Sequence, residues 1–255
     1  MKSLYESILK STKSGKLAFI KKWIFDNLFN HESISRITVE DVDKYFEVSA
    51  NGEISTKSNI GLNIDNIKEL PKDIKFKDVQ ASFCFGGKKE YVKPEIFPEY
   101  ANKIYIDGSI GTIPSFKMDV CCGLVIEDHC PQLYHIEPIE LNFVANKKSG
   151  NVWEDRYLDL GNTRIKKEDL DNIHCTGKSI TALILENTSL EIELLKNIRR
   201  IKKGKKKGEY EHEIYTYLDE YFKNFPKCNI VNISKGDLKR VDMTTYNVWL
   251  LPKGV

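Results

Sequence analysis

Short apolar pairs, each split by one residue, recur along the middle of the chain between Leu62 and Asn187. The pairs begin at Leu62, Phe83, Ile104, Leu124, Leu141, Leu158 and Leu183. Their starting positions are 21, 21, 20, 17, 17 and 25 residues apart. Alternation over three residues indicates a very short strand with one apolar face. A strand this short cannot bury that face alone, so the period predicts stacked coils with a shared core, a solenoid over residues 59–187.

The equivalent position of these pairs predicts that all seven stack in one parallel strand ladder. Two units are nearly the same phrase, Leu158-Asp-Leu-Gly-Asn-Thr and Leu183-Ile-Leu-Glu-Asn-Thr. The returning arms of two coils are expected to end at Pro71 and Pro114, because proline lacks an N–H and restricts the residue before it. The alternative is an ordinary α+β domain whose strands fall at this spacing by chance.

Asn146, Thr163 and Thr188 each lie three residues after the second apolar residue of a unit. Together with the repeated units, they give the chain a resemblance to the leucine-rich-repeat family. In that family an Asn, Thr or Cys at this place hydrogen-bonds the backbone of adjacent coils. The resemblance therefore implies an irregular leucine-rich-repeat-like solenoid of the α+β class. The chain departs from the family's pattern in its earlier units, where the same place holds Ile67, Lys88, Ser109 and His129.

Residues 1–58 are predicted to form a helical and β-hairpin cap. Apolar residues at helical spacing predict a helix over 17–30, and a shorter helix is predicted over 3–11. We expect the longer helix to cover the first coil with Trp23, because the end repeats of a solenoid need a cover. Alternation predicts strands over 37–39 and 46–48. Asn51-Gly52 then predicts a hairpin turn into a strand at 53–55.

The first 87 residues carry a second resemblance. It rests on the opening Lys2-Ser-Leu-Tyr-Glu-Ser-Ile-Leu, a helix that bears lysines and a tryptophan, a β-hairpin, the segment Leu70-Pro-x-x-Ile-x-Phe76 and the Phe83-Cys84 strand. They resemble uncharacterised repeat proteins encoded by tailed bacteriophages of gut bacteria and by their hosts. That family has no assigned activity. The resemblance implies an alternative function as a virion or assembly protein, placed in the host cytoplasm or in the virion.

Residues 188–255 are predicted to form an α+β cap over the last coil. Apolar residues between Leu190 and Ile201 follow a helical period, and Gly204 is expected to end that helix. A second helix is predicted to begin near Glu209 and to end before Pro226. Two strands are predicted after it, at 229–233 and 246–251.

The composition mainly excludes classes of protein, namely membrane-spanning, secreted and strongly charged chains. No apolar run is long enough to cross a membrane, and no signal peptide is expected because Glu6 falls where its apolar run would begin. A formal net charge of +2 creates no global field that attracts nucleic acid or membrane. Without a signal peptide, the six cysteines are expected to be reduced thiols of a cytoplasmic protein.

No motif predicts catalysis, a cofactor or a metal site. His129-Cys130 and His174-Cys175 are adjacent pairs, whereas zinc ligands are usually separated by about two to five residues. Neighbouring residues on a strand point to opposite faces, so each pair offers a single ligand. Ser14-Gly15-Lys16 lacks the upstream glycine and the preceding strand of a phosphate-binding loop. We therefore expect a protein that is not an enzyme.

The outward positions of the repeated units indicate a protein-interaction module that binds a protein partner. A solenoid presents these positions as an extended face. Tyrosines are favoured anchors of such faces. The candidate binding residues are Asn63, Tyr105, Val125, Asn142, Asp159 and Tyr134.

A basic segment at 196–207 offers nucleic-acid binding as a third function. It holds eight Lys or Arg, and such clusters release counterions from a phosphate backbone. The near-neutral net charge and the acidic start of the next helix, at Glu209, argue against nucleic acid as a partner. The segment also contains no aromatic residue, whereas proteins that bind single strands combine a basic groove with aromatic stacking.

Overall fold

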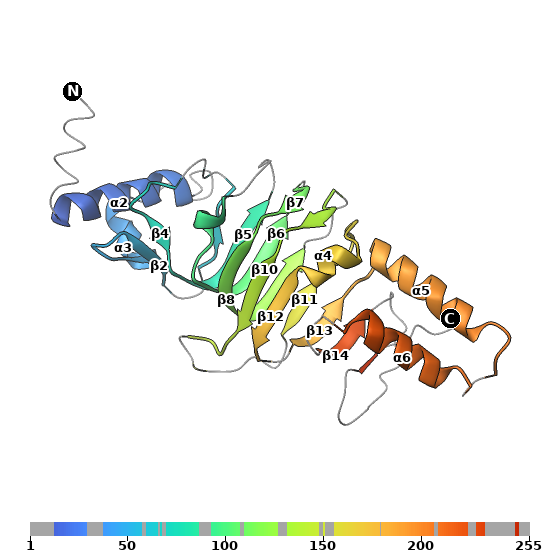
Figure 1. The fold of residues 1–255 in the computed structure, drawn as a ribbon. Coiled ribbons are helices and arrows are strands. Elements are labelled where there is room, and N and C mark those ends of the chain that lie inside the picture. The colour runs from blue at the N-terminus through green and yellow to red at the C-terminus, as the bar shows by residue number, and fades with distance from the viewer. Residues whose placement is uncertain are drawn as a thin grey trace.

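Parallel strands run along the middle of an elongated molecule, with α2 and α3 at one end and α5 and α6 at the other (Figure 1). This computed structural model describes residues 13–29, 38–57, 60–65, 67, 70–86, 93–107, 110–126, 132–147, 150, 156–178, 180–206, 209–223, 228–232 and 248–249. The helix predicted over 3–11 lies outside these described residues. The architecture is a parallel β-solenoid with additional helices, as the period predicted.

One parallel ladder runs through most of the chain. It joins Leu62, Phe83, Ile104, Leu124, Leu158 and Leu183 in register. The strands concerned are β3 (Leu62–Asn63), β5 (Asp78–Gly86), β6 (Tyr100–Asp107), β8 (Phe116–Ile126), β11 (Tyr157–Asp159) and β13 (Ile180–Ile184). We call this set the main ladder. Six of the seven predicted pairs therefore stack as predicted, and all of these pairings are parallel.

The prediction for Leu141 is wrong. Its strand β10 (Ile139–Phe143) pairs with the first half of β8, where Leu141 lies opposite Met118. On its other side β10 pairs with β12 (Ile173–Gly177), again in parallel. We call β10, β12 and the first halves of β5, β6 and β8 the branch ladder. Both ladders show the same alternation of apolar and polar residues, so the sequence pattern does not distinguish them. The two 17-residue steps, from Leu124 to Leu141 and from Leu141 to Leu158, therefore form a single coil of 34 residues (158 − 124).

The core lies behind the two ladders and is continuous along the solenoid. The second apolar residues of the main-ladder units are all buried, namely Ile64, Phe85, Ile106, Ile126, Leu160 and Leu185. Aromatic rings fill the early coils, where Phe97 stacks on Phe116 with ring centroids 4.0 Å apart. Phe97 follows the short 3-10 helix η2 (Pro94–Ile96). Burial of one such side chain contributes about 1.5–3 kcal/mol. Because these side chains are buried against the neighbouring coils, each coil depends on its neighbours for much of its stability.

The returning arms of the coils form a smaller third side. There β7 (Thr112–Ile113) pairs in parallel with β9 (His135–Ile136). In the next coil helix α4 (Lys167–Asp171) takes this place. The buried Asp169 accepts a hydrogen bond from the Ile136 N–H at 3.0 Å, which ties α4 to β9. Pro114 ends an arm as predicted, directly after β7.

Hydrogen bonds between coils differ from those that the leucine-rich-repeat resemblance implied. Thr163 Oγ1 donates to the Leu160 carbonyl at 2.8 Å, and Thr188 Oγ1 donates to the Leu185 carbonyl at 2.6 Å. Both carbonyls belong to the same coil as the threonine, so the expected links to adjacent coils are wrong at these positions. Neighbouring asparagines make the link instead. Asn187 Nδ2 donates to Asn162 Oδ1 at 2.9 Å, and both residues have positive φ, 58° and 59°.

The N-terminal cap consists of a helix and a small sheet. It contains α2 (Lys13–Leu28), η1 (Val39–Asp41), α3 (Val42–Tyr45), β1 (Phe46–Val48), β2 (Glu53–Thr56) and β4 (Lys75–Phe76). The predicted hairpin is confirmed, because β1 and β2 pair antiparallel around Asn51-Gly52. The strand predicted at 37–39 is wrong at its described end. The Asp41 carboxylate accepts hydrogen bonds from both the N–H and the hydroxyl of Thr38, which favours the helical turn η1 over a strand.

The C-terminal region contains both predicted helices and both predicted strands. These are α5 (Ser189–Lys202), α6 (Glu211–Tyr221), β14 (Cys228–Asn232) and β15 (Val248–Trp249). Thr188 caps α5 by accepting from the Glu191 N–H at 3.0 Å, and the helix ends before Gly204, which has a φ of +78°. Strand β14 pairs in parallel with β13 and then with β15. The main ladder therefore continues beyond residue 187.

The packing of α2 yields a stability prediction for Trp23. Its ring lies against Phe76, with centroids 6.3 Å apart, and the partly buried side chain contacts the core. We expect Trp23→Ala to lower the free energy of unfolding by about 3 kcal/mol, because truncating a large aromatic ring leaves a cavity. Urea denaturation measures the change. Lys22→Ala is the control, since it alters only an exposed pair with Asp26 and should cost less than about 0.5 kcal/mol. Equal effects of the two substitutions would contradict this role for Trp23.

Candidate functional site

The outer face of the main ladder brings four of the six candidate binding residues into one row. Asn63, Tyr105, Val125 and Asp159 occupy equivalent register positions, together with Cys84 and Ile184. Their neighbours on either side along each strand point inward and are buried. The strict alternation of a strand therefore places this row on the surface.

Lys103 and Tyr157 extend this row into a cluster. Lys103 Nζ lies 4.4 Å from the centroid of the Tyr105 ring and 4.9 Å from that of the Tyr157 ring. Lys103 on β6 and Tyr157 on β11 both pair with Gly123 of the strand between them, β8. The lysine side chain therefore crosses over Gly123, where no side chain is in its way. We call Lys103, Tyr105 and Tyr157 the cation–aromatic cluster.

The rings of Tyr105 and Tyr157 stabilise the positive charge of Lys103. Partial burial would lower the pKa of its ammonium group, but the interactions with Tyr105 and Tyr157 outweigh burial, and the pKa is raised. No ion pair to Lys103 occurs within the described part of the chain. The group is thus a fixed positive charge on the outer face whose nearest partners are neutral rings.

The polar residues of the row play a different part. Asn63 Oδ1 accepts from the Asp65 N–H at 2.8 Å, and Asp159 Oδ1 accepts from the Gly161 N–H at 3.1 Å. Both side chains thereby cap the turn that follows their own strand. The side chains of this face that bind no neighbouring turn are the aromatic rings, the Lys103 ammonium group and the half-buried Val125.

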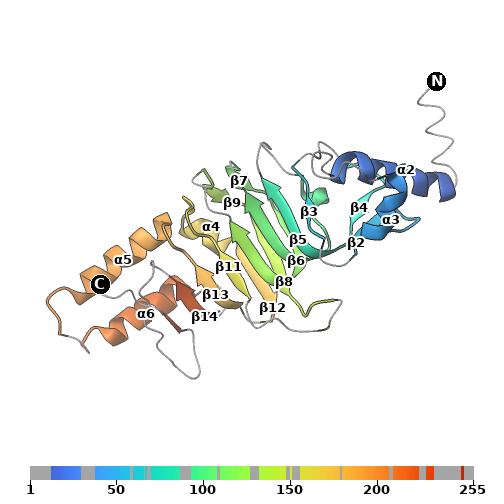
Figure 2. The same cartoon turned by 180° about the vertical axis from the view of Figure 1, so that it is seen from behind.

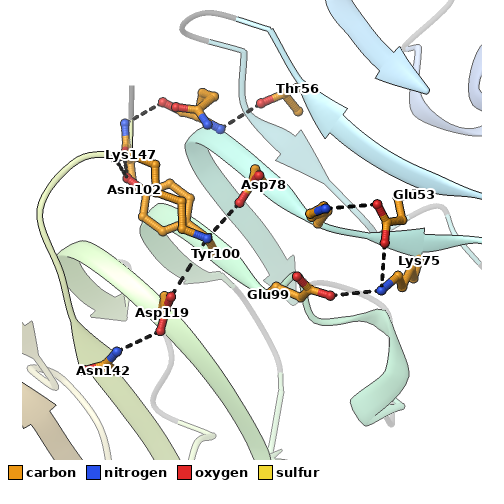
Figure 3. A network of polar contacts seen from close by, with 12 residues as sticks. Glu53, Thr56, Lys75, Asp78, Glu99, Tyr100, Asn102, Asp119, Asn142 and Lys147 are labelled. Atoms are coloured by element: carbon orange, nitrogen blue, oxygen red, sulfur yellow. Dashed lines mark hydrogen bonds and ion pairs between the residues drawn. The ribbon is translucent and has the colours of Figure 1, made fainter. Parts of the chain in front are cut away.

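Asn142 lies apart from this row, on the outer face of the branch ladder. Its Nδ2 donates to Asp119 Oδ1 at 2.9 Å, and its Oδ1 accepts from Thr176 Oγ1 at 3.3 Å. Figure 3 shows that Asp119 and Asp78 both point towards Lys147, whose Nζ lies 2.9 Å from Asp78 Oδ1 and 3.8 Å from Asp119 Oδ2. Both polar groups of the Asn142 amide thus form hydrogen bonds within the protein, and the structure does not place Asn142 in the row that contains Tyr105.

Lys147 and its neighbour fold back over the branch ladder. Asn146 Nδ2 donates to Asn102 Oδ1 at 2.8 Å, and the Lys147 ammonium group lies 4.7 Å from the centroid of Tyr100. The Tyr100 hydroxyl, which donates to Asn102, is fully buried, and this burial raises its pKa. A shallow depression of about 550 Å³ remains beside this network. It is lined by Glu99, Lys117, Met118, Asp119, Glu140, Asn142 and Thr176.

Tyr134 lies on the third side of the solenoid, away from the other candidates. Its N–H donates to the Gly111 carbonyl at 3.1 Å, just before β9. Tyr134 is 61% exposed, which is unusual for a large hydrophobic residue. The structure therefore does not combine Tyr134 with the row that contains Tyr105.

Sequence reasoning missed Lys103 and Tyr157, although a signal for both was present. Each stands two residues before an outward residue, in Lys103-Ile-Tyr105 and Tyr157-Leu-Asp159. Side chains two apart on a strand share a face, so both positions belong to the outer surface. The cluster could have been predicted by including, in each unit, the outward residue that lies two positions before the row.

Among the described residues, no group of three or more His, Cys, Asp or Glu is arranged to hold a metal ion. The Cys122 thiol lies beside the cluster, but burial and the neighbouring Cys121 raise its pKa to about 12, so the reactive thiolate is scarce at neutral pH. His174 is exposed on β12, whereas His129 and Cys130 lie outside the described ranges. No helix within those ranges is long and apolar enough to cross a bilayer.

Comparison with family models, curated proteins and solved structures finds no match to this chain. The two resemblances drawn from the sequence therefore stay predictions.

Gly123 provides a test of how the cluster is held. Its φ is +145°, and an added Cβ would lie 1.8 Å from the Tyr157 carbonyl oxygen. We expect Gly123→Ala to cost about 3 kcal/mol, because it combines backbone strain with a clash that separates β8 from β11. Gly150→Ala is the matched control. That glycine also has a positive φ, +68°, but no atom lies within 4 Å of the added Cβ, so the cost should be about 1 kcal/mol. Similar losses in thermal unfolding for both variants would contradict the close approach.

Proposed function

We propose that this chain is a non-catalytic protein-interaction module that binds a protein partner with the outer face of the main ladder. The observation that carries the proposal is the Lys103 ammonium group between the rings of Tyr105 and Tyr157. Large rings held by regular strands offer contact area at a small cost in conformational entropy. Tyrosine is also enriched among the residues that dominate the energy of protein interfaces.

The charge of the cluster favours a partner that brings a carboxylate. Lys103 has no ion pair among the described residues, and Asp159 of the same row already caps a turn. A partner carboxylate would therefore meet a partly desolvated ammonium group, where an ion pair is screened less than on the open surface. Val125 lies next to Tyr105 in the same row and offers an apolar contact beside the charge.

Selection from a library of short random peptides tests this chemistry. We expect the selected peptides to contain Asp or Glu together with an aromatic or aliphatic residue. Lys103→Met should weaken their binding by about tenfold, because it removes a charge-assisted contact and keeps the aliphatic stem over Gly123. Fluorescence anisotropy of a labelled peptide measures the dissociation constant.

Lys117→Met is the matched control for this experiment. Lys117 is an exposed lysine of the branch ladder that pairs with Glu140, so its loss changes the net charge equally and leaves the main ladder intact. Peptide affinity should then stay as in the parent protein. Unchanged affinity in Lys103→Met, or an equal loss in both variants, would overturn the proposed face.

The alternative function, a virion or assembly protein, makes a different prediction for the chain alone. An interaction module is expected to be a monomer at all accessible concentrations, whereas an assembly protein associates with its own copies as concentration rises. Size-exclusion chromatography with light scattering over a wide concentration range separates the two. Concentration-dependent growth in mass would favour the assembly role.

A further inference from the structure

A second candidate site lies between α5 and α6, at the opposite end of the molecule from α2. The two helices lie side by side in both views of the molecule (Figures 1 and 2). A cleft of about 390 Å³ opens between them, within the usual range for small-ligand sites. It is lined by Asn197, Arg200, Ile201, Lys203, Lys205, Glu213 and Tyr217.

The cleft carries a surplus of positive charge. Lys205 pairs with Glu213, so these two side chains neutralise each other. Arg200 and Lys203 form no ion pair with any residue that the structure describes. Two guanidinium or ammonium groups on one rim can together contact a phosphate, for which arginine offers a planar pair of donors.

A neutral polar pair lies beside these cations. Asn197 Nδ2 donates to the Tyr217 hydroxyl oxygen at 2.9 Å. Burial raises the pKa of Tyr217 and the hydrogen bond from Asn197 partly opposes this, so the phenol stays protonated. Its O–H hydrogen and the Asn197 Oδ1 have no acceptor or donor among the described residues. One donor and one acceptor thus lie at the hydroxyl end of the Tyr217 side chain, in the lining of the cleft.

From this arrangement we propose that the cleft binds a nucleotide. Arg200 and Lys203 hold the phosphate, while the base lies against Tyr217 and Ile201 with its polar edge towards Asn197. The basic segment at 196–207 itself contains no aromatic residue. Helix α6 supplies the missing ring, because Tyr217 packs beside α5. The volume of the cleft favours a single nucleotide over a strand, in which many bases stack along a groove.

Isothermal titration calorimetry with the common ribonucleoside monophosphates, at low ionic strength, tests the proposal. We expect at least one of them to bind, and the nucleoside without its phosphate to bind at least about tenfold more weakly. The double variant Arg200→Ala with Lys203→Ala should lose at least about tenfold in affinity for the same reason. Tyr217→Phe should lose several-fold and keep its melting temperature, since the ring and its packing remain.

The matched control is Arg164→Ala with Lys178→Ala. It removes the same two residue types from exposed positions that line no part of the cleft. Its affinity should equal that of the parent protein. Absence of binding by every nucleotide, or an equal loss in the control, overturns the site. Binding of a single-stranded oligonucleotide without binding of any mononucleotide would also overturn it, in favour of a nucleic-acid surface.

Discussion

Burial of the repeated apolar pairs between successive coils is the constraint on which the rest of this structure depends. A unit such as Leu158-Asp159-Leu160 is too short to be stable alone, and its two leucines are buried only because coils lie on either side. Parallel pairing is the arrangement that lets every coil present the same face to the core. Stability is therefore shared between neighbours, and the two ends need covers, which α2 and its sheet supply at the first coil.

The same constraint positions the outward side chains. Because the inward residues hold the register, Lys103 and Tyr157 must both lie opposite Gly123. A side chain at position 123 would separate Lys103 from Tyr157. Because residue 123 is a glycine, the Lys103 side chain reaches across β8 from its own strand β6 to the Tyr157 ring on β11. The cation–aromatic cluster thus follows from core packing and one glycine, and it requires no loop to hold it.

Much of the fold could be predicted from sequence because its signal is local and repeated. The alternation in Phe83-Cys84-Phe85 identifies a strand, and the recurrence of that pattern identifies a ladder. Leu141 could not be placed in the same way, since its alternation equals that of the main ladder although it belongs to the branch ladder. Thr163 satisfies the family pattern but bonds within its own coil, and only the backbone geometry of the turn decides this. Arg200 and Tyr217 lie on two different helices outside the repeats, so their shared cleft depends on how α5 and α6 pack together.

The two proposed sites use positive charge in physically different settings. The net charge of +2 gives the molecule no strong overall field, so each site depends on its local surroundings. Lys103 is partly buried against two rings, which reduces its exposure to counterions. Arg200 and Lys203 stand exposed on the rim of an open cleft, where salt at physiological strength screens charges over about 8 Å. Binding to the cleft should therefore weaken more steeply with added salt than binding to the main ladder. If added salt weakened binding at both sites equally, the rings would contribute little to shielding Lys103 from counterions.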